Sequence, residues 1–247
     1  GMGVDVGDYD GDGDGDIFVT NFYGETNTLY RNDGQLQFVD ATSSSGLAAP
    51  SVEYLGWGAH FFDADSDGDL DLFSVNSHVY PQVDQALTGG GYAQRNQLFR
   101  NDGGSYVEVD GGPGLAVKAV SRGTASGDYD GDGDVDLLVT NLDEAPTLLR
   151  NDTETSNGHI AVDLLGKGLN RHGVGAQVGV RVNGQTLLRT VNSGSGYLGA
   201  NGLRLHFGLG PGARAEWVSV QWPSGARDTV RTVAGGTVLR LSEGGEK

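Results

Sequence analysis

Short apolar runs, separated by turns rich in Gly, Asn and Asp, fill the first 155 residues of the chain. Runs of four to eight apolar or alternating residues between turn signals are typical of β-strands, whereas helices need longer stretches with a period near 3.6. Three of the runs end in Asn, at residues 17–21, 72–76 and 137–141. The pattern predicts short strands with little helix.

Each of these runs is followed by a second marker, in which two apolar residues precede Arg-Asn-Asp, at 29–34, 98–103 and 148–152. Self-similarity at long spacing indicates a repeat architecture, and short strands in this number fit one four-stranded propeller blade per repeat. The second repeat alone carries an insertion, roughly 77–95. This insertion is interpreted either as a binding surface or as a loop that covers a blade edge.

From residue 158 the alternation of apolar and polar positions becomes longer. Period-two runs occupy 159–165, 177–182, 187–191, 217–222 and 237–241, and Asn183-Gly184 is a hairpin signal. We predict an all-β protein: a partial β-propeller over 1–155, followed by an antiparallel β-sandwich or barrel over 156–247.

The charge distribution agrees with two domains. The chain has 33 acidic and 16 basic residues, for a net charge of −17. Residues 1–155 hold 28 acidic and 6 basic side chains, net −22, and residues 156–247 hold 5 and 10, net +5. A surface this acidic repels phosphate, so a nucleic-acid partner is not expected.

Composition excludes several other classes. There is no Cys, which removes disulfides, thiolate zinc sites and Cys nucleophiles. No apolar stretch reaches the ~18 residues that a membrane span needs, and residues 1–5 lack the layout of a secretory signal. A membrane span is not expected, and any targeting segment is expected to be removed or to lie outside this chain.

Fifteen of the 25 Asp residues lie in three nine-residue segments, 8–16, 63–71 and 128–136, which we call the first, second and third acidic loops. Five carboxylates so close together repel one another by about 1 kcal/mol per close pair even in water. The charge therefore calls for a bound cation. The pattern suits Ca²⁺: it offers Asp at loop positions 1, 3, 5 and 9, Gly at position 6 for a sharp turn, and a free carbonyl at position 7. Mg²⁺ fits less well, because it prefers to keep its waters.

An EF-hand is excluded because that loop needs a bidentate Glu at position 12, which here is Val19, Ser74 or Val139 between β-type flanks. Merely solvated Asp/Gly turns are the remaining alternative, which three complete copies in register disfavour.

The acidic loops and their markers resemble the FG-GAP/VCBS repeats of integrin-alpha-type β-propellers. The resemblance implies about three Ca²⁺ ions, held by the side chains of positions 1, 3, 5 and 9 and the carbonyl of position 7. The implied ligands are Asp8, Asp10, Asp12, Asp14 and Asp16; Asp63, Asp65, Asp67, Asp69 and Asp71; and Asp128, Asp130, Asp132, Asp134 and Asp136. Closed propellers have four to eight blades, so the chain is expected to be a piece of a longer protein or to close its sheet edges with other chains.

Four C-terminal stretches, 170–176, 193–198, 205–210 and 222–225, resemble the ASPIC/UnbV domain. That domain accompanies FG-GAP/VCBS repeats in secreted proteins such as the cartilage acidic protein family. The resemblance then spans nearly the whole chain, and it implies no defined biochemical activity.

No convergent catalytic cluster is visible: 173–179 has the wrong spacing for a dinucleotide loop, and Ser193 and Ser195 lack a nucleophile-elbow frame. The expected function is therefore a non-enzymatic, secreted or periplasmic module, rigidified by Ca²⁺, for adhesion or assembly. Its partner would be a protein or glycan at a cell surface or matrix, or another copy joined through blade edges. The alternatives are an accessory subunit of an extracellular enzyme and a carbohydrate-binding module, for which Trp217 or Trp222 would be exposed.

Overall fold

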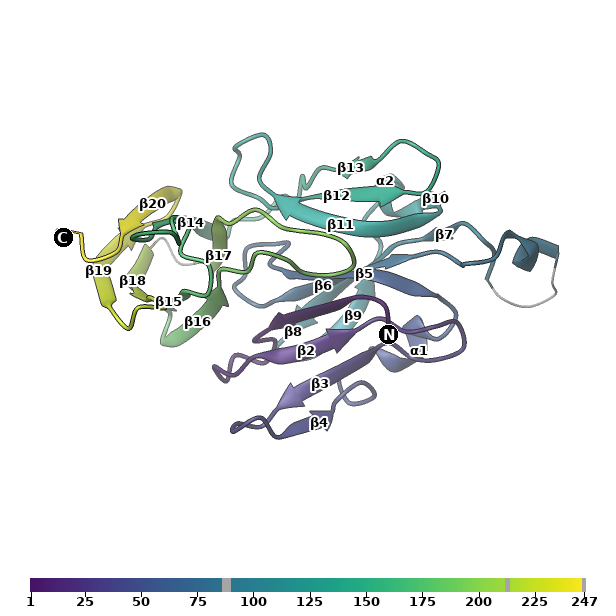
Figure 1. Cartoon of the computed structure of the whole chain (residues 1–247), viewed down its shortest axis with the longest axis horizontal. Coiled ribbons are helices and arrows are strands. Elements are labelled where there is room, and N and C mark those ends of the chain that lie inside the picture. The colour runs from purple at the N-terminus through teal and green to yellow at the C-terminus, as the bar shows by residue number, and fades with distance from the viewer. Residues whose placement is uncertain (86–89, 212–213, 246–247) are drawn as a thin grey trace.

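The computed structural model describes residues 1–85, 90–211 and 214–245, so residues 86–89 of the predicted insertion lie outside it. Almost all regular elements are strands, and the two α-helices among these residues have four residues each. The predicted all-β class is confirmed. Figure 1 shows three small sheets next to one another and, beyond them, a two-sheet unit formed by the C-terminal third of the chain.

The first repeat forms an antiparallel sheet in simple chain order. Its strands are β1 (Val4–Gly7), β2 (Asp16–Val19), β3 (Thr28–Asn32) and β4 (Phe38–Asp40). The apolar run of the repeat is β2 and the second marker is β3. The first acidic loop is therefore the turn between the first two strands of its sheet.

The second repeat follows the same plan. After the short helix α1 (Ala48–Ser51), it consists of β5 (Gly56–Phe62), β6 (Asp71–Asn76), β8 (Gln97–Asp102) and β9 (Ser105–Val109). The described part of the insertion contains the 3₁₀ helix η1 (Pro81–Gln85) and the strand β7 (Gln94–Arg95), which pairs with β10 (Lys118–Ala119).

The third repeat has three strands rather than the predicted four. After the short helix α2 (Pro113–Ala116), they are β11 (Ser121–Gly127), β12 (Asp136–Asn141) and β13 (Thr147–Leu149). The segment 150–157, which follows β13, runs without a strand to the C-terminal unit instead of turning back along the sheet.

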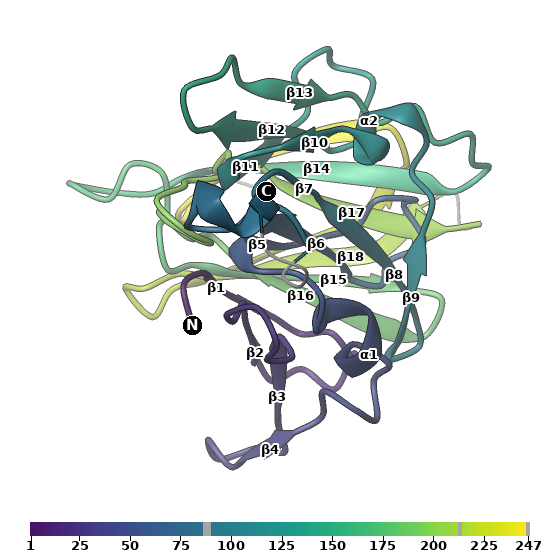
Figure 2. The same cartoon turned by 90° about the vertical axis from the view of Figure 1, so that its right-hand side faces the viewer.

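Two apolar cores lie between the three sheets, and β5 and β6 supply both because their side chains alternate in direction. Phe61 and Leu72 pack with residues of the first repeat, whereas Phe62 and Phe73 pack with residues of the third. This explains why all six residues of β6 are buried. In Figure 2 the sheets fan out from their first strands, with β4, β9 and β13 outermost.

The C-terminal unit is a two-layer β-structure with its own core, which includes Trp222, Phe207 and Ile160. One sheet has the order β17-β14-β20 and the other β16-β15-β18-β19. Their bounds are β14 (Gly158–Leu165), β15 (Gln177–Val182), β16 (Gln185–Thr190), β17 (Leu205–Gly210), β18 (Arg214–Gln221), β19 (Arg227–Ala234) and β20 (Thr237–Ser242). One pair departs from the predicted antiparallel pattern, since β14 and β20 run parallel.

The segment between β16 and β17 reaches back to the repeats. Gly196 exchanges backbone hydrogen bonds with Val4 of β1, and the Gly202 amide donates to the carbonyl of Ser126 in β11 at 3.0 Å. The ring of Tyr197 packs edge-on against that of Trp57 in β5, with centroids 4.9 Å apart. One segment of the C-terminal unit thus contacts the first strand of all three repeats.

No helix among residues 1–85, 90–211 and 214–245 is both long and apolar enough to cross a bilayer.

Candidate metal centres

The three acidic loops share one backbone conformation. Gly at position 6 has φ between +95° and +104° in all three loops, as the predicted sharp turn requires. At position 4 the second loop has Ser66 with φ +59°, where the other loops have Gly. A non-glycine residue in this region is uncommon, so the turn is retained in the second loop against the preference of its sequence.

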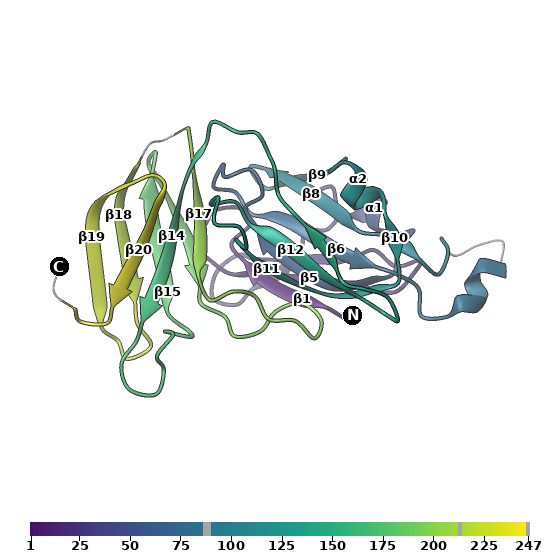
Figure 3. The ribbon, with the colours of Figure 1, turned by 90° about the horizontal axis from the view of Figure 1, so that it is seen from above.

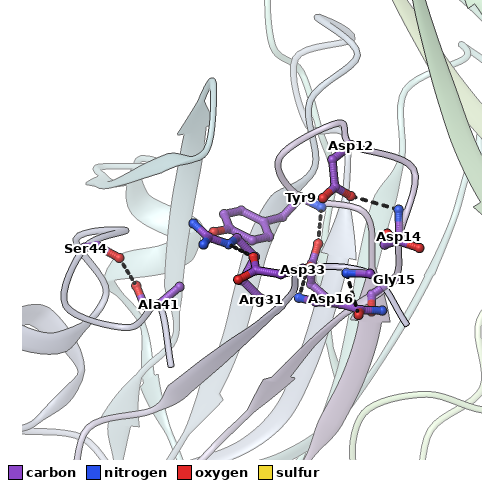
Figure 4. Close-up of polar contacts among 11 residues, drawn as sticks. Tyr9, Asp12, Asp14, Gly15, Asp16, Arg31, Asp33, Ala41 and Ser44 are labelled. Atoms are coloured by element: carbon purple, nitrogen blue, oxygen red, sulfur yellow. Dashed lines mark hydrogen bonds and ion pairs between the residues drawn. The ribbon is translucent and has the colours of Figure 1, made fainter. Parts of the chain in front are cut away.

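The same internal hydrogen bonds recur in each loop. The position-1 carboxylate accepts the position-6 amide, at 3.1 Å for Asp8, 3.0 Å for Asp63 and 3.2 Å for Asp128. The position-5 carboxylate accepts the position-7 amide, as Asp12 does from Asp14 at 2.8 Å in Figure 4. These bonds close the loop and orient the carboxylates that begin it.

The position-9 carboxylate joins each loop to the rest of its sheet. Both oxygens of Asp16 accept amides, one from Tyr9 at 3.0 Å (Figure 4) and the other from Asn32 in β3 at 2.8 Å. Asp71 makes the same two bonds: it accepts the amides of Ala64 and Asn101, both at 2.8 Å. Asp136 accepts the amide of Tyr129 at 3.1 Å and that of Asn151 at 2.8 Å. Position 9 is buried in all three loops.

The structure brings together the carboxylates of positions 1, 3 and 9. In each of three groups, one oxygen per residue lies within 4.8 Å of the others. The groups are Asp8, Asp10 and Asp16; Asp63, Asp65 and Asp71; and Asp128, Asp130 and Asp136. The position-5 carboxylates of Asp12, Asp67 and Asp132 are not in these groups, and one oxygen of each accepts the position-7 amide. The position-7 side chain of Asp69 instead accepts the amide of Gly103.

Burial raises the pKa of several of these carboxyl groups above the ordinary value of 3.8. It raises the pKa of Asp16 and Asp63 to about 7, that of Asp67 to about 6 and that of Asp71 to about 8. Neighbouring aspartates raise these pKa values further, and backbone amides oppose the shift at Asp16 and Asp71. Without a cation the loops therefore tend to hold protons, which a divalent ion would displace.

Two buried oxygens support a cation at these points. Among the described residues, Oδ1 of Asp8 and Oδ1 of Asp63 are buried and have no hydrogen-bond partner. A buried polar atom without a partner costs about 1–3 kcal/mol, so such atoms call for an explanation. In both residues Oδ2 is taken by a backbone amide, which leaves Oδ1 for an ion. The oxygen donors of the loops fit a hard divalent cation.

The Asn residues of the markers, to which the sequence alone assigns no role, connect neighbouring repeats. Asn101 Nδ2 donates to the carbonyl of Leu70 in its own loop at 3.0 Å and to that of Tyr9 in the first loop at 2.8 Å. Asn151 Nδ2 donates to the carbonyl of Ala64 in the second loop at 2.7 Å. The second and third markers thus tie their sheets to the acidic loop of the preceding repeat, and the recurrence of the markers was the available signal.

A second unforeseen feature is a cavity of about 690 Å³ between the first strands of the sheets and the C-terminal unit. On its wall, His60 Nδ1 lies 3.1 Å from Asp5 Oδ2 and 3.0 Å from Asn201 Nδ2. The Asp5 carboxylate also accepts the amide of Phe61 at 2.8 Å. These contacts connect β1, β5 and the segment between β16 and β17.

The aromatic residues proposed for sugar stacking lie in different settings. Trp222 is buried in the core, and its Nε1 donates to Asp228 Oδ2 at 2.7 Å, whereas Trp217 is half-buried. Around the insertion, Phe22 and Tyr80 are exposed, and their ring centroids lie 5.8 and 6.0 Å from that of the His78 imidazole.

Comparison with known families agrees with this geometry. The FG-GAP-like repeat matches residues 2–74, which contain the first two acidic loops, and the ASPIC and UnbV family matches residues 166–247. The chain combines FG-GAP-like repeats with an ASPIC/UnbV domain. Residues 75–165 lie outside both matches, so the boundary near residue 155 stays a prediction.

The chain is also distantly homologous to cartilage acidic protein 1. It is 29% identical to the Homo sapiens protein over 294 residues, which cover 98% of this chain and 44% of the relative. The Mus musculus protein is 28% identical over 91% of this chain and 42% of its own length, and the Xenopus tropicalis protein 27% identical over 96% and 36%. The FG-GAP/ASPIC chain thus spans less than half the length of these curated relatives.

Proposed function

We propose that the protein is a non-enzymatic structural module in which calcium rigidifies the FG-GAP-like repeats for adhesion or assembly. The observation that carries this proposal is the threefold repetition of one carboxylate cluster on one hydrogen-bonded loop. Calcium accepts six to eight oxygen ligands in flexible geometry, which suits three carboxylates together with loop carbonyls. Magnesium demands octahedral geometry at shorter distances and keeps its waters.

Calcium would stabilise the folded repeats by mass action. A site with free ion at a hundredfold excess over its Kd adds about 2.7 kcal/mol to the free energy of unfolding. Calcium at millimolar concentration outside the cell would keep such sites loaded, whereas low cytosolic calcium would not. We therefore place the protein outside the cell or in the periplasm.

The proposed partners are a protein or glycan of a surface or matrix. The name of the relative, cartilage acidic protein 1, describes an acidic protein of cartilage, and this chain has a net charge of −17. Assembly through sheet edges is a variant of the proposal. The outermost strands of the first and third sheets are β4 and β13, and an edge strand can pair with a strand of another chain.

Calorimetric titration of the metal-free protein with calcium, and separately with magnesium, tests the proposal. We expect about three calcium sites, weaker binding of magnesium and a higher thermal unfolding midpoint in calcium than in chelator. Identical midpoints in calcium and chelator, without heat of binding, would overturn the metal assignment.

A carbohydrate-binding role is the second candidate, supported by the exposed rings of Phe22 and Tyr80 beside His78. Aromatic faces are common platforms for the apolar faces of sugars. Glycan-array binding that is lost in Phe22→Ala and Tyr80→Ala, but retained when the acidic loops are altered, would favour this role over the first.

A further inference from the structure

The C-terminal unit lies against the acidic loops of the repeats. Figure 3 shows its sheets at the end of the molecule toward which the turns between the first two strands of the repeats point. The closest contacts involve the second loop. The Gly208 amide in β17 donates to Asp63 Oδ2 at 2.9 Å, and the Gly210 amide donates to the carbonyl of Ser66 at 3.0 Å.

There is no spare room at this contact. A Cβ atom built on Gly208 would lie 2.3 Å from Asp63 Oδ2 and 2.3 Å from the Ser66 carbonyl carbon. Real Cβ atoms do not approach other atoms so closely, so only glycine allows β17 to reach the loop here. The backbone of the C-terminal unit is therefore in direct contact with a carboxylate of the second metal cluster.

Arg189 in β16 adds a charge between the first two loops. Its guanidinium is partly buried, donates to the Gly68 carbonyl at 3.1 Å and lies 5.5 Å from the centroid of the Phe207 ring. One side chain of the C-terminal unit thus contacts the backbone of the second loop directly and brings a positive charge to it.

The other two loops also meet the C-terminal unit closely. In the first loop, a Cβ on Gly11 would lie 2.8 Å from Nε2 of Gln185. In the third loop, a Cβ on Gly133 would lie 2.1 Å from the imidazole of His159. All three loops therefore have a neighbour from the C-terminal unit within contact distance.

We propose that the C-terminal unit is a docking partner of the loaded acidic loops, so that calcium binding and docking of this unit stabilise one another. The inference rests on the proposed calcium binding. The second loop shows the connection in atomic terms. Oδ2 of Asp63 accepts two amides, one from Gly68 and one from Gly208, and the remaining oxygen is buried, without a partner and free for the ion.

Such coupling is reciprocal. If docking fixes the Asp63 carboxylate in the orientation that binds calcium, then calcium must favour the docked state by the same factor. Gly208 is then a positioning residue for the second site, because it acts on the ion only through Asp63. Removing the ion should loosen β16 and β17, although neither strand contains a predicted ligand.

Hydrogen exchange of the full chain tests this without any variant. In calcium we expect amides of 185–190 and 205–210 to exchange at least tenfold more slowly than in chelator. Amides of 227–234, in β19 at the far edge of its sheet, serve as the internal reference and should change little. Calcium binding by calorimetry with unchanged exchange in both segments would overturn the coupling and leave the proposed function intact. Absence of calcium binding would overturn both.

The variant Gly208→Ala tests the same coupling from the other side. We expect one calcium site to weaken at least tenfold while two keep their affinity, and the calcium-dependent protection of 205–210 to fall. Gly194→Ala is the matched control, because its Cβ would have its nearest neighbour at 3.8 Å and Gly194 has no positive φ. Three unchanged sites in Gly208→Ala would contradict the positioning role.

Discussion

Replacement of Asp71 by Asn should change stability by an amount that depends on calcium. Asp71 is 1% exposed, belongs to the second carboxylate cluster and accepts amides from Ala64 and Asn101 at 2.8 Å each. An Asn side chain keeps the shape but replaces one acceptor oxygen with an NH₂ group. One of the two amides then faces a donor instead of an acceptor.

In chelator the effect should be moderate. The pKa of Asp71 is raised to about 8 by burial, so its carboxyl group is mostly protonated and neutral at pH 7, as Asn is. The remaining cost is one unpaired buried amide, about 1–3 kcal/mol. In calcium the substitution also removes a charged ligand. Loss of a site that is loaded at a hundredfold excess costs about 2.7 kcal/mol more.

The assay is thermal unfolding of the native chain and of Asp71→Asn, each in excess calcium and in excess chelator. For a chain of this length, 1 kcal/mol corresponds to about 2–4 °C, so the stabilisation by calcium should shrink by about 5–10 °C in the variant. Asp163→Asn is the control, because Asp163 pairs with Arg204 outside the acidic loops. This variant should lose the same amount of stability in calcium and in chelator. Equal losses for Asp71→Asn in calcium and in chelator would refute the reasoning.

Three further predictions concern the same loops. In chelator, the free energy of unfolding should fall from pH 5 to pH 8. The reason is that folding raises the pKa of Asp71 to about 8, so this carboxyl group stabilises the fold only while it is protonated. Melting curves measured across this pH range should show that calcium suppresses the fall. Arg189→Met should destabilise the protein by about 1.5–3 kcal/mol in chelator, the value of its charged hydrogen bond to the Gly68 carbonyl, and by less in calcium, the opposite of Asp71→Asn, because the ion replaces the lost charge near Asp63. Asn101→Ala should lower the free energy of unfolding, measured with denaturant, by about 2–4 kcal/mol, since it removes two buried hydrogen bonds. Asn32→Ala is the comparison: the Nδ2 bond of Asn32 is 3.3 Å long, so its loss should cost about 1 kcal/mol.

Local sequence signals predicted the strands and the loops well. Period-two alternation and Asp-Gly turns depend on neighbouring residues alone, so the strand that follows each acidic loop was located within a residue or two at 16–19, 71–76 and 136–141. The three carboxylate clusters follow from the same local register. The assignment of Asp12, Asp67 and Asp132 as ligands stays a prediction, because one oxygen of each accepts the position-7 amide and the other has no such bond.

Contacts distant in sequence were not predictable from pattern. The parallel pairing of β14 with β20 joins segments about 75 residues apart, and nothing in their alternation distinguishes parallel from antiparallel neighbours. Arg189 and Gly208 are separated from Asp63 by more than 120 residues. Within their own strands they look like a surface Arg and an ordinary Gly, and only the fold brings them to the loop.

The arrangement of hydrogen bonds explains why one ion could affect the whole molecule. At the second loop, the Asp71 carboxylate holds the loop to the third strand of its sheet, Asn101 holds that strand to the first loop, and the Gly208 amide of the C-terminal unit donates to Asp63. The second carboxylate cluster is therefore a junction of three elements. Neutralising it would strengthen contacts within a repeat, between repeats and between the repeats and the ASPIC/UnbV domain. With 15 of its 25 Asp residues in the three acidic loops, the chain should therefore link the calcium bound in a loop to contacts outside that loop.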